Sequence, residues 1–129
     1  MSLETPSLLI TDDNRAFRET LREVFEPRGF HTVAASDGAE ALEIVQTEEI
    51  HLVLLDMHMP RLTGLELLQQ LQRQEIVLPC ILISAALDEA ITRQAREAEA
   101  FSVLAKPVRF AEITHTVAQA MRVTYDWPS

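Results

Sequence analysis

Several residue types are scarce in this chain of 129 residues, which contains one cysteine, three glycines, one tryptophan and one tyrosine. The single cysteine, Cys80, excludes an intrachain disulfide and favours a cytoplasmic location. No apolar run approaches the roughly 18 residues of a membrane span, and residues 1–6 lack the pattern of a signal peptide. Basic residues are also few, since 11 Lys and Arg against 20 Asp and Glu give 11 − 20 = −9. This charge disfavours direct contact with nucleic acid.

The remaining composition is ordinary for a folded domain, with 47% hydrophobic and 24% charged residues. Such values exclude collagen-like, disordered and disulfide-scaffold proteins. At a typical domain size of roughly 100–150 residues, the length predicts a single domain over residues 1–129.

Short apolar segments alternate with helical periodicities from one end of the chain to the other. The apolar segments are residues 8–10, 30–35, 52–55, 80–83 and 101–105. Four of them are nearly continuous in apolar character, as strands covered on both faces must be, and the more polar segment 30–35 predicts an edge strand. The order is βα five times, which predicts an α/β fold with a doubly wound, five-stranded parallel sheet.

The helices between these strands are marked by apolar spacing and by capping residues. Apolar residues recur at helical intervals in two segments, Phe17, Leu21, Val24 and Phe25 in the first and Ile113, Val117, Ala120 and Met121 in the second. Residues 37–40 and 63–66 each match a capping box and so predict two helix starts. The segment 87–98 has only a thin apolar stripe, and we expect its helix to be less stable.

Polar residues follow four of the five predicted strands. The first strand runs into Asp12 and Asp13, the third into Asp56, the fourth into Ser84 and the fifth into Lys106. The carboxyl ends of parallel strands meet at one edge of a sheet, where ligands bind in folds of this class. Crowded carboxylates repel each other unless a cation is present, and hard oxygen ligands suit Mg²⁺. A metal, an ammonium and a hydroxyl around one carboxylate predict a site that accepts a phosphoryl group.

These residues resemble the receiver domain of two-component response regulators, a CheY-like family. The resemblance rests on Asp12-Asp13, Asp56 followed by residues 57–60 and Gly64, the pair Ser84-Ala85, and Lys106-Pro107. It covers nearly the whole chain, about residues 7–123, and implies the flavodoxin-like strand order 2-1-3-4-5.

The resemblance also implies a role for each residue of the site. Asp56 is the phosphoryl acceptor and also belongs to the Mg²⁺ site, Asp13 is a direct metal ligand, and Asp12 acts on the metal mainly through water. The backbone carbonyl of His58 is a further ligand, and Ser84 and Lys106 bind phosphoryl oxygens. By the same resemblance the donor is a phosphohistidine of a sensor histidine kinase or of a histidine phosphotransfer protein. The domain is then a signalling phosphoacceptor rather than a conventional enzyme, although it catalyses its own phosphorylation and dephosphorylation. The peptide before Pro107 is expected to be cis.

One position departs from the family pattern. The family usually has an aromatic residue three positions before its lysine, and this chain has Val103 there, which has no ring to turn inward. The family's usual contact surface combines the fourth helix, fifth strand and fifth helix, through which an output partner or a second copy, forming a homodimer, binds. We therefore expect any switch at this surface to involve movement of the loop 84–88 and the helix 87–98.

Three other interpretations of these residues remain open at this point. Asp12-Asp13 could be a solvated turn that caps the following helix. A haloacid-dehalogenase-like phosphohydrolase also uses an aspartate and Mg²⁺, but that family separates its two aspartates by one residue, whereas here they are adjacent. A receiver-like module that is never phosphorylated is favoured only by Val103.

Overall fold

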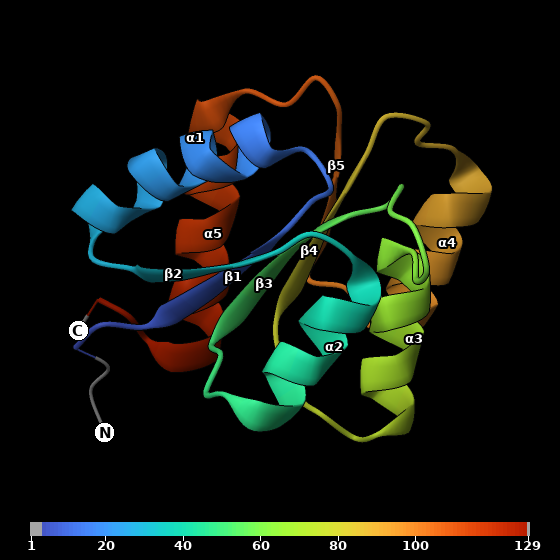
Figure 1. Ribbon diagram of the computed structural model, residues 1–129, viewed down its shortest axis with the longest axis horizontal. Helices are drawn as coiled ribbons and strands as arrows, with labels where there is room; N and C mark the ends of the chain where they lie inside the picture. The colour runs from blue at the N-terminus through green and yellow to red at the C-terminus, as the bar shows by residue number, and fades with distance from the viewer. Residues whose placement is uncertain (1–3, 129) are drawn as a thin grey trace.

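The computed structural model of the protein describes residues 4–128 and contains five parallel strands, each followed by a helix (Figure 1). The strands are β1 (Ser7–Thr11), β2 (His31–Ala35), β3 (Leu52–Asp56), β4 (Cys80–Ser84) and β5 (Ser102–Ala105). The helices are α1 (Arg15–Phe25), α2 (Gly38–Thr47), α3 (Gly64–Arg73), α4 (Glu89–Glu97) and α5 (Phe110–Tyr125), and the 3-10 turn η1 (Glu26–Arg28) follows α1. The predicted alternation of strands and helices is confirmed.

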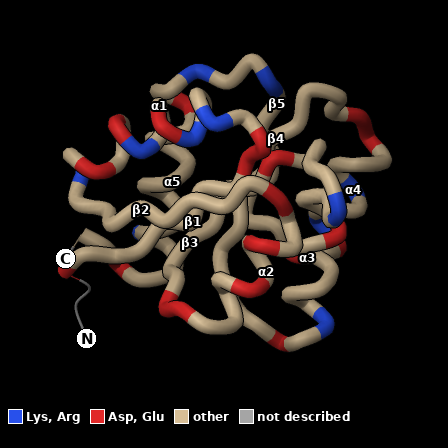
Figure 2. The backbone as a smooth tube through the Cα atoms, in the orientation of Figure 1, with Lys and Arg blue, Asp and Glu red and all other residues tan. Residues whose placement is uncertain are grey.

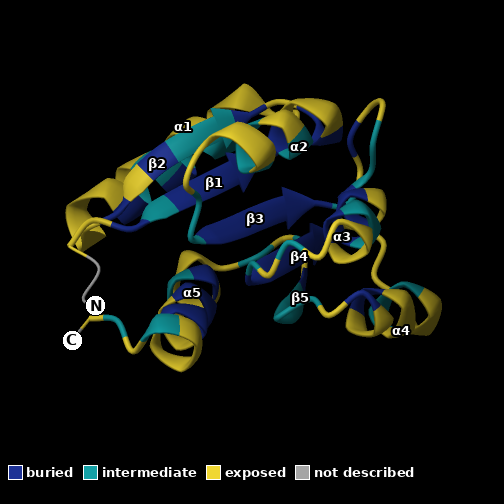
Figure 3. Ribbon diagram, turned by 90° about the horizontal axis from the view of Figure 1, so that it is seen from below, coloured by how far each residue is buried: buried dark blue, intermediate teal, exposed yellow. Residues whose placement is uncertain are grey.

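The sheet has the order β2-β1-β3-β4-β5, as the family resemblance implied. The predicted edge strand β2 lies at one side of the sheet and β5 at the other. Every residue of β3 and β4 is buried, because helices cover both faces of these central strands (Figure 3).

Two apolar layers enclose the sheet, one on each face. The first joins Leu8, Ile10, Leu54 and Ile81 to α1 and α5, and the second joins Leu9, Val53, Leu55 and Leu82 to α2, α3 and α4. Helix α4 contributes only Ala95 as a buried residue, in agreement with its thin apolar stripe. Cys80 is a free, buried thiol within the second layer, and burial raises its pKa to about 12.

Helix starts agree with the predicted caps, with one correction. Thr63 and Glu66 form the reciprocal capping box at the start of α3. Asp37 caps α2 by accepting a hydrogen bond from the Glu40 backbone N–H, but the Glu40 carboxylate binds the backbone N–H of Ser36 instead of that of Asp37. The prediction of a complete capping box at 37–40 was therefore wrong, because the glutamate reaches one residue further back.

Charged residues are interspersed over the molecule, as Figure 2 shows, with Lys and Arg scattered among acidic residues. Among the residues that the structure describes, no helix has the length and hydropathy needed to cross a membrane.

Candidate phosphoacceptor and metal site

The register of β1 and β3 brings two of the predicted carboxylates side by side. Thr11 pairs with Leu55, so the residues that follow them, Asp12 just after β1 and Asp56 at the end of β3, lie at the same level of the sheet. Asp12 is 2% exposed and Asp56 is 5% exposed, although both are carboxylates. Asp13 is exposed beside them, and one oxygen from each of the three residues lies within 4.8 Å of the others.

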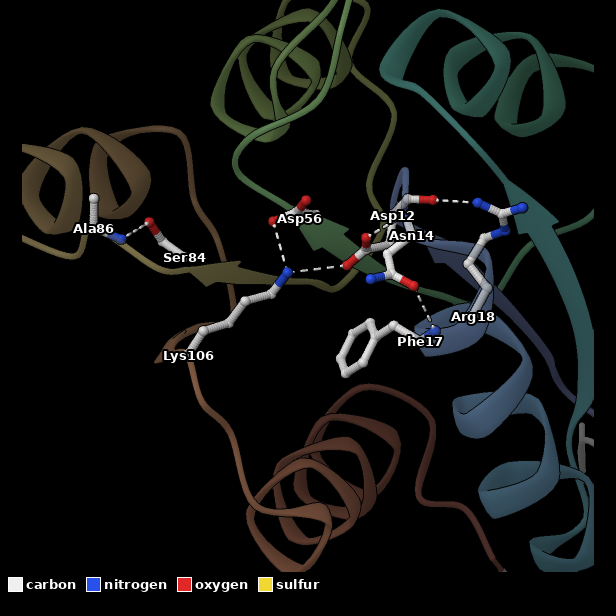
Figure 4. A network of polar contacts seen from close by, with 8 residues as sticks. All are labelled: Asp12, Asn14, Phe17, Arg18, Asp56, Ser84, Ala86 and Lys106. Carbon is white, nitrogen blue, oxygen red and sulfur yellow. Dashed lines mark hydrogen bonds and ion pairs between the residues drawn. The ribbon is translucent and has the colours of Figure 1, made fainter.

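Lys106 places a positive charge between two of these carboxylates. Its Nζ atom is 3.2 Å from Asp12 Oδ2 and 3.2 Å from Asp56 Oδ1 (Figure 4). Its side chain is 27% exposed, so both ion pairs are largely shielded from solvent. The same ammonium lies over the Phe17 ring, 5.1 Å from the ring centroid, which is within the range of a cation–π contact.

The environment of Asp56 opposes its ionised form. Burial raises the pKa of the Asp56 carboxyl, the charge of Asp12 raises it further, and Lys106 and the backbone N–H of His58 act in the opposite direction. Burial lowers the pKa of the Lys106 ammonium, but the charges of Asp12 and Asp56 outweigh this effect and raise it. A positive charge at this place therefore stabilises the ionised form of Asp56.

The donor set fits a magnesium ion. Three carboxylates within reach of one point offer the hard oxygen ligands that Mg²⁺ prefers. Oδ1 of Asp56 is also buried and accepts no hydrogen bond of good geometry from the described residues. The contact of this oxygen with the Lys106 ammonium at 3.2 Å leaves a lone pair for a further cation.

Ser84 and His58 lie on segments next to this cluster. The Ser84 side chain is fully buried at the end of β4, and its Oγ accepts a hydrogen bond from the backbone N–H of Ala86 rather than contacting Asp56. Figure 4 shows Ser84 and Ala86 on the far side of Lys106 from Asp12. His58 is exposed on the loop that follows β3. The peptide between Lys106 and Pro107 is cis, as expected from the resemblance.

Three residues around the cluster were not predicted from the sequence. Asn14, not an aspartate, caps α1 through its side-chain oxygen, so the interpretation of Asp12-Asp13 as a helix cap was wrong. Arg18 donates from Nη1 to the Asp12 carbonyl oxygen at 2.7 Å, and Phe17 contacts Lys106. Asn14 could have been recognised as a cap from its residue type, whereas no periodicity indicates the contacts of Arg18 and Phe17.

Comparison with known proteins agrees with this geometry. A family model described as the response regulator receiver domain matches residues 8–118. The chain belongs to the response regulator receiver family. Because it does, the haloacid-dehalogenase interpretation has no support.

Curated receiver proteins and a solved receiver structure resemble most of the chain. Sporulation initiation phosphotransferase F of Bacillus subtilis is 34% identical over 110 residues, which cover 85% of this chain and 89% of that protein. Response regulator MprA of Mycobacterium leprae is 38% identical over 118 residues, which cover 91% of this chain but 51% of that protein. The chain thus spans about half the length of several relatives. The receiver domain of Francisella response regulator 1452 has a TM-score of 0.85 at 28% identity, covering 93% of this chain and 100% of that chain.

Receiver domains of response regulators interact with histidine kinases or phosphotransfer proteins, and this chain shares their fold and family. Val103 is half-buried in β5 and packs against the second apolar layer. It offers no aromatic ring at this position.

Proposed function

We propose that this receiver domain accepts a phosphoryl group on Asp56 from a phosphohistidine of a sensor kinase or a histidine phosphotransfer protein, in a Mg²⁺-dependent reaction. The observation that carries the proposal is the Asp56 carboxylate itself, which is buried at the end of a central strand beside two further carboxylates and an ammonium. In the transfer, the bond between phosphorus and the donor nitrogen breaks and a bond between phosphorus and an Asp56 oxygen forms. The imidazole leaves with the electron pair and takes up a proton.

Asp12, Asp13, Asp56 and the His58 backbone carbonyl are the proposed ligands of the metal. When bound, Mg²⁺ supplies positive charge that neutralises the phosphoryl oxygens and the crowded carboxylates. Lys106 supplies a second positive charge beside Asp56, and its contacts with Asp12 and Phe17 hold the ammonium near the proposed acceptor.

Ser84 is proposed to donate a hydrogen bond to a phosphoryl oxygen. Its Oγ now accepts from Ala86, which leaves the hydroxyl proton free to be donated once the side chain turns toward Asp56. Such a turn breaks the hydrogen bond to Ala86 and so loosens the loop 84–88. We propose that this loop and α4 carry the signal to an output partner or a second copy, since Val103 has no ring to move.

The same site is proposed to promote hydrolysis of the acyl phosphate, so that the domain returns to its starting state without a separate enzyme. We also propose that residues 1–129 act as one receiver domain in the cytoplasm. The free thiol of Cys80 is compatible with this location.

The proposal is tested by incubating the protein with acetyl phosphate and Mg²⁺ and measuring the intact mass. The wild type is expected to gain one phosphoryl group, and Asp56→Asn is expected to gain none. Asp126→Asn is the matched control, because Asp126 is an exposed residue at the end of α5, outside the carboxylate cluster and the loop 84–88. Labelling of Asp56→Asn to the wild-type extent would show that the acceptor is another residue. An unlabelled wild type would support the interpretation as a module that is never phosphorylated.

A further inference from the structure

The loop that follows the acceptor, residues 57–63, carries an unusual backbone conformation. Arg61 has a φ of 68°, in the left-handed region that residues other than glycine rarely adopt. Such a conformation is unfavourable for a residue that carries a side chain, and it persists only where surrounding contacts determine it. The contacts of Arg61 therefore show what holds the loop in this conformation.

Arg61 is held by an ion pair with Asp37, the residue that caps the start of α2. Its Nη2 atom lies 2.5 Å from Asp37 Oδ2, and the other oxygen of Asp37 accepts the backbone N–H of Glu40 at 2.8 Å. The side chain of Asp37 is 11% exposed and that of Arg61 is 67% exposed, so the pair joins a nearly buried carboxylate to a guanidinium group at the surface. The Glu40 backbone N–H lowers the pKa of Asp37, and Arg61 lowers it further against the effect of burial.

The backbone of the loop also lies very close to the start of α2. A Cβ atom added at Gly38 would lie 2.3 Å from the carbonyl oxygen of Leu62, so only glycine allows the loop to lie this close. At the other end of the loop, the Gly64 N–H donates to the Met57 carbonyl at 3.2 Å. The segment is thus fixed at both ends, and His58 lies between these points.

We propose that Arg61 is a positioning residue for the phosphoacceptor site: its ion pair with Asp37 holds the loop 57–62 on the start of α2 and thereby keeps the His58 peptide group beside Asp56. The inference rests on the proposed function, in which the His58 carbonyl is a metal ligand and its N–H stabilises the ionised acceptor. The effect passes through the backbone, since the ion pair of Arg61 is with Asp37 and not with a residue of the carboxylate cluster. Loss of the pair leaves the fold intact but lets the loop move away from α2.

The test compares Arg61→Gln, Arg61→Lys and Asp37→Asn with the wild type and with the double variant Arg61→Gln/Asp37→Asn. Asp37→Asn keeps an oxygen that can cap α2, and Arg61→Lys restores a positive charge. Arg93→Gln is the matched control, because Arg93 is an exposed arginine of α4 that forms no ion pair within residues 4–128. Three quantities are measured: the melting temperature, the Mg²⁺ affinity by calorimetry, and amide exchange of residues 57–62 in metal-free protein.

We expect Arg61→Gln and Asp37→Asn each to weaken Mg²⁺ binding about three- to tenfold, less than is lost when a direct partner of a metal ligand is removed. The double variant should bind no more weakly than either single variant, because both remove the same interaction. Arg61→Lys should recover part of the affinity, and Arg93→Gln should match the wild type. Amide exchange in the loop should be faster in Arg61→Gln while the melting temperature changes little.

Arg61→Gly separates positioning from stability. Glycine relieves the left-handed backbone and so offsets the lost ion pair in the melting temperature, but it cannot hold the loop. Weaker Mg²⁺ binding at an unchanged melting temperature supports the proposal. Unchanged metal affinity in both Arg61→Gln and Arg61→Gly, or additive losses in the double variant, overturns it.

The outcome is distinguishable from failure of the proposed function. If the wild type binds no Mg²⁺ and gains no phosphoryl group, the proposed function fails, and amide exchange in metal-free protein still decides the inference. Loop exchange that is identical in the wild type and Arg61→Gln then shows that Arg61 positions nothing.

Discussion

Replacing Lys106 with methionine tests the electrostatics of the site directly. Methionine keeps much of the volume and apolar stem of lysine but removes the ammonium that lies 3.2 Å from both Asp12 and Asp56. The two carboxylates then face each other while nearly excluded from water. We expect the domain to remain folded but to lose stability in a way that depends on pH.

The size of the loss follows from the distances. At an effective dielectric constant of about 20, each contact at 3.2 Å is worth about 5 kcal/mol of gross Coulomb attraction, much of which is offset by desolvation of the three charges. An unpaired, buried carboxylate can take up a proton instead of staying charged, so the free energy of that protonation is the upper limit of what the lost ion pair costs. From an unfolded pKa of about 3.9, this limit is about 5.5 kcal/mol at pH 8 and about 1.5 kcal/mol at pH 5. We therefore expect Lys106→Met to lower the free energy of unfolding by about 2–4 kcal/mol at pH 8 and by no more than about 1.5 kcal/mol at pH 5.

The sign of the pH dependence comes from Asp56, whose pKa is already raised by burial and by Asp12. Without Lys106 its folded pKa rises further above the unfolded value, so the folded state binds more protons and the variant loses stability as pH rises. The stabilisation that Lys106 gains from its own raised pKa is lost only above about pH 10.5, outside this range. The assay is urea denaturation of wild type and variant in EDTA at both pH values. A variant as stable as the wild type at pH 8, or an equal loss at pH 5 and pH 8, would refute the reasoning.

Four further outcomes are expected. Millimolar Mg²⁺ should raise the melting temperature of the wild type, because binding to the folded state alone stabilises it, and Asp13→Ala should abolish most of this rise. Gly64→Ala should lower the free energy of unfolding by about 1–3 kcal/mol in urea denaturation, since a Cβ there would lie 2.5 Å from the Asp56 carbonyl oxygen. Because the pKa of Asp37 is lowered in the folded state, its ionised carboxylate stabilises the fold at pH values above the ordinary aspartate pKa, and this stabilisation is lost as the pH falls through the folded pKa. The difference in unfolding free energy between wild type and Asp37→Asn should therefore shrink from pH 6 to pH 3. Binding of beryllofluoride, a phosphoryl analogue, should change amide exchange in α4 more than in α1, and equal changes would place the switch elsewhere.

The fold could be predicted from the sequence because its signals are local. Buried parallel strands are nearly continuous in apolar character, and the five segments recognised in this way agree with β1–β5 to within one or two residues at most ends. Two helix starts could be predicted in the same way, since Asp37 and Thr63 are capping residues followed by a glutamate three positions later.

The clustering of the carboxylates could also be predicted from the sequence, because residues at the carboxyl ends of neighbouring parallel strands meet at one edge of the sheet. The roles of these residues stay predictions until the site is labelled and mutated. Contacts between loops were not accessible to this reasoning. Neither spacing nor residue type indicates that Arg61 pairs with Asp37, or that Glu40 binds Ser36, because such contacts depend on how separate turns lie against each other after folding.

The ion pair between Asp12 and Lys106 joins positions that are 94 residues apart in the chain. During synthesis, Asp12 and Asp56 therefore leave the ribosome long before Lys106, whose ammonium lies beside both carboxylates in the folded domain. The site becomes complete only when β5 has added to the edge of the sheet beside β4. A nascent chain that has not yet added β5 therefore carries Asp12 and Asp56 without the ammonium that lies between them in the folded domain.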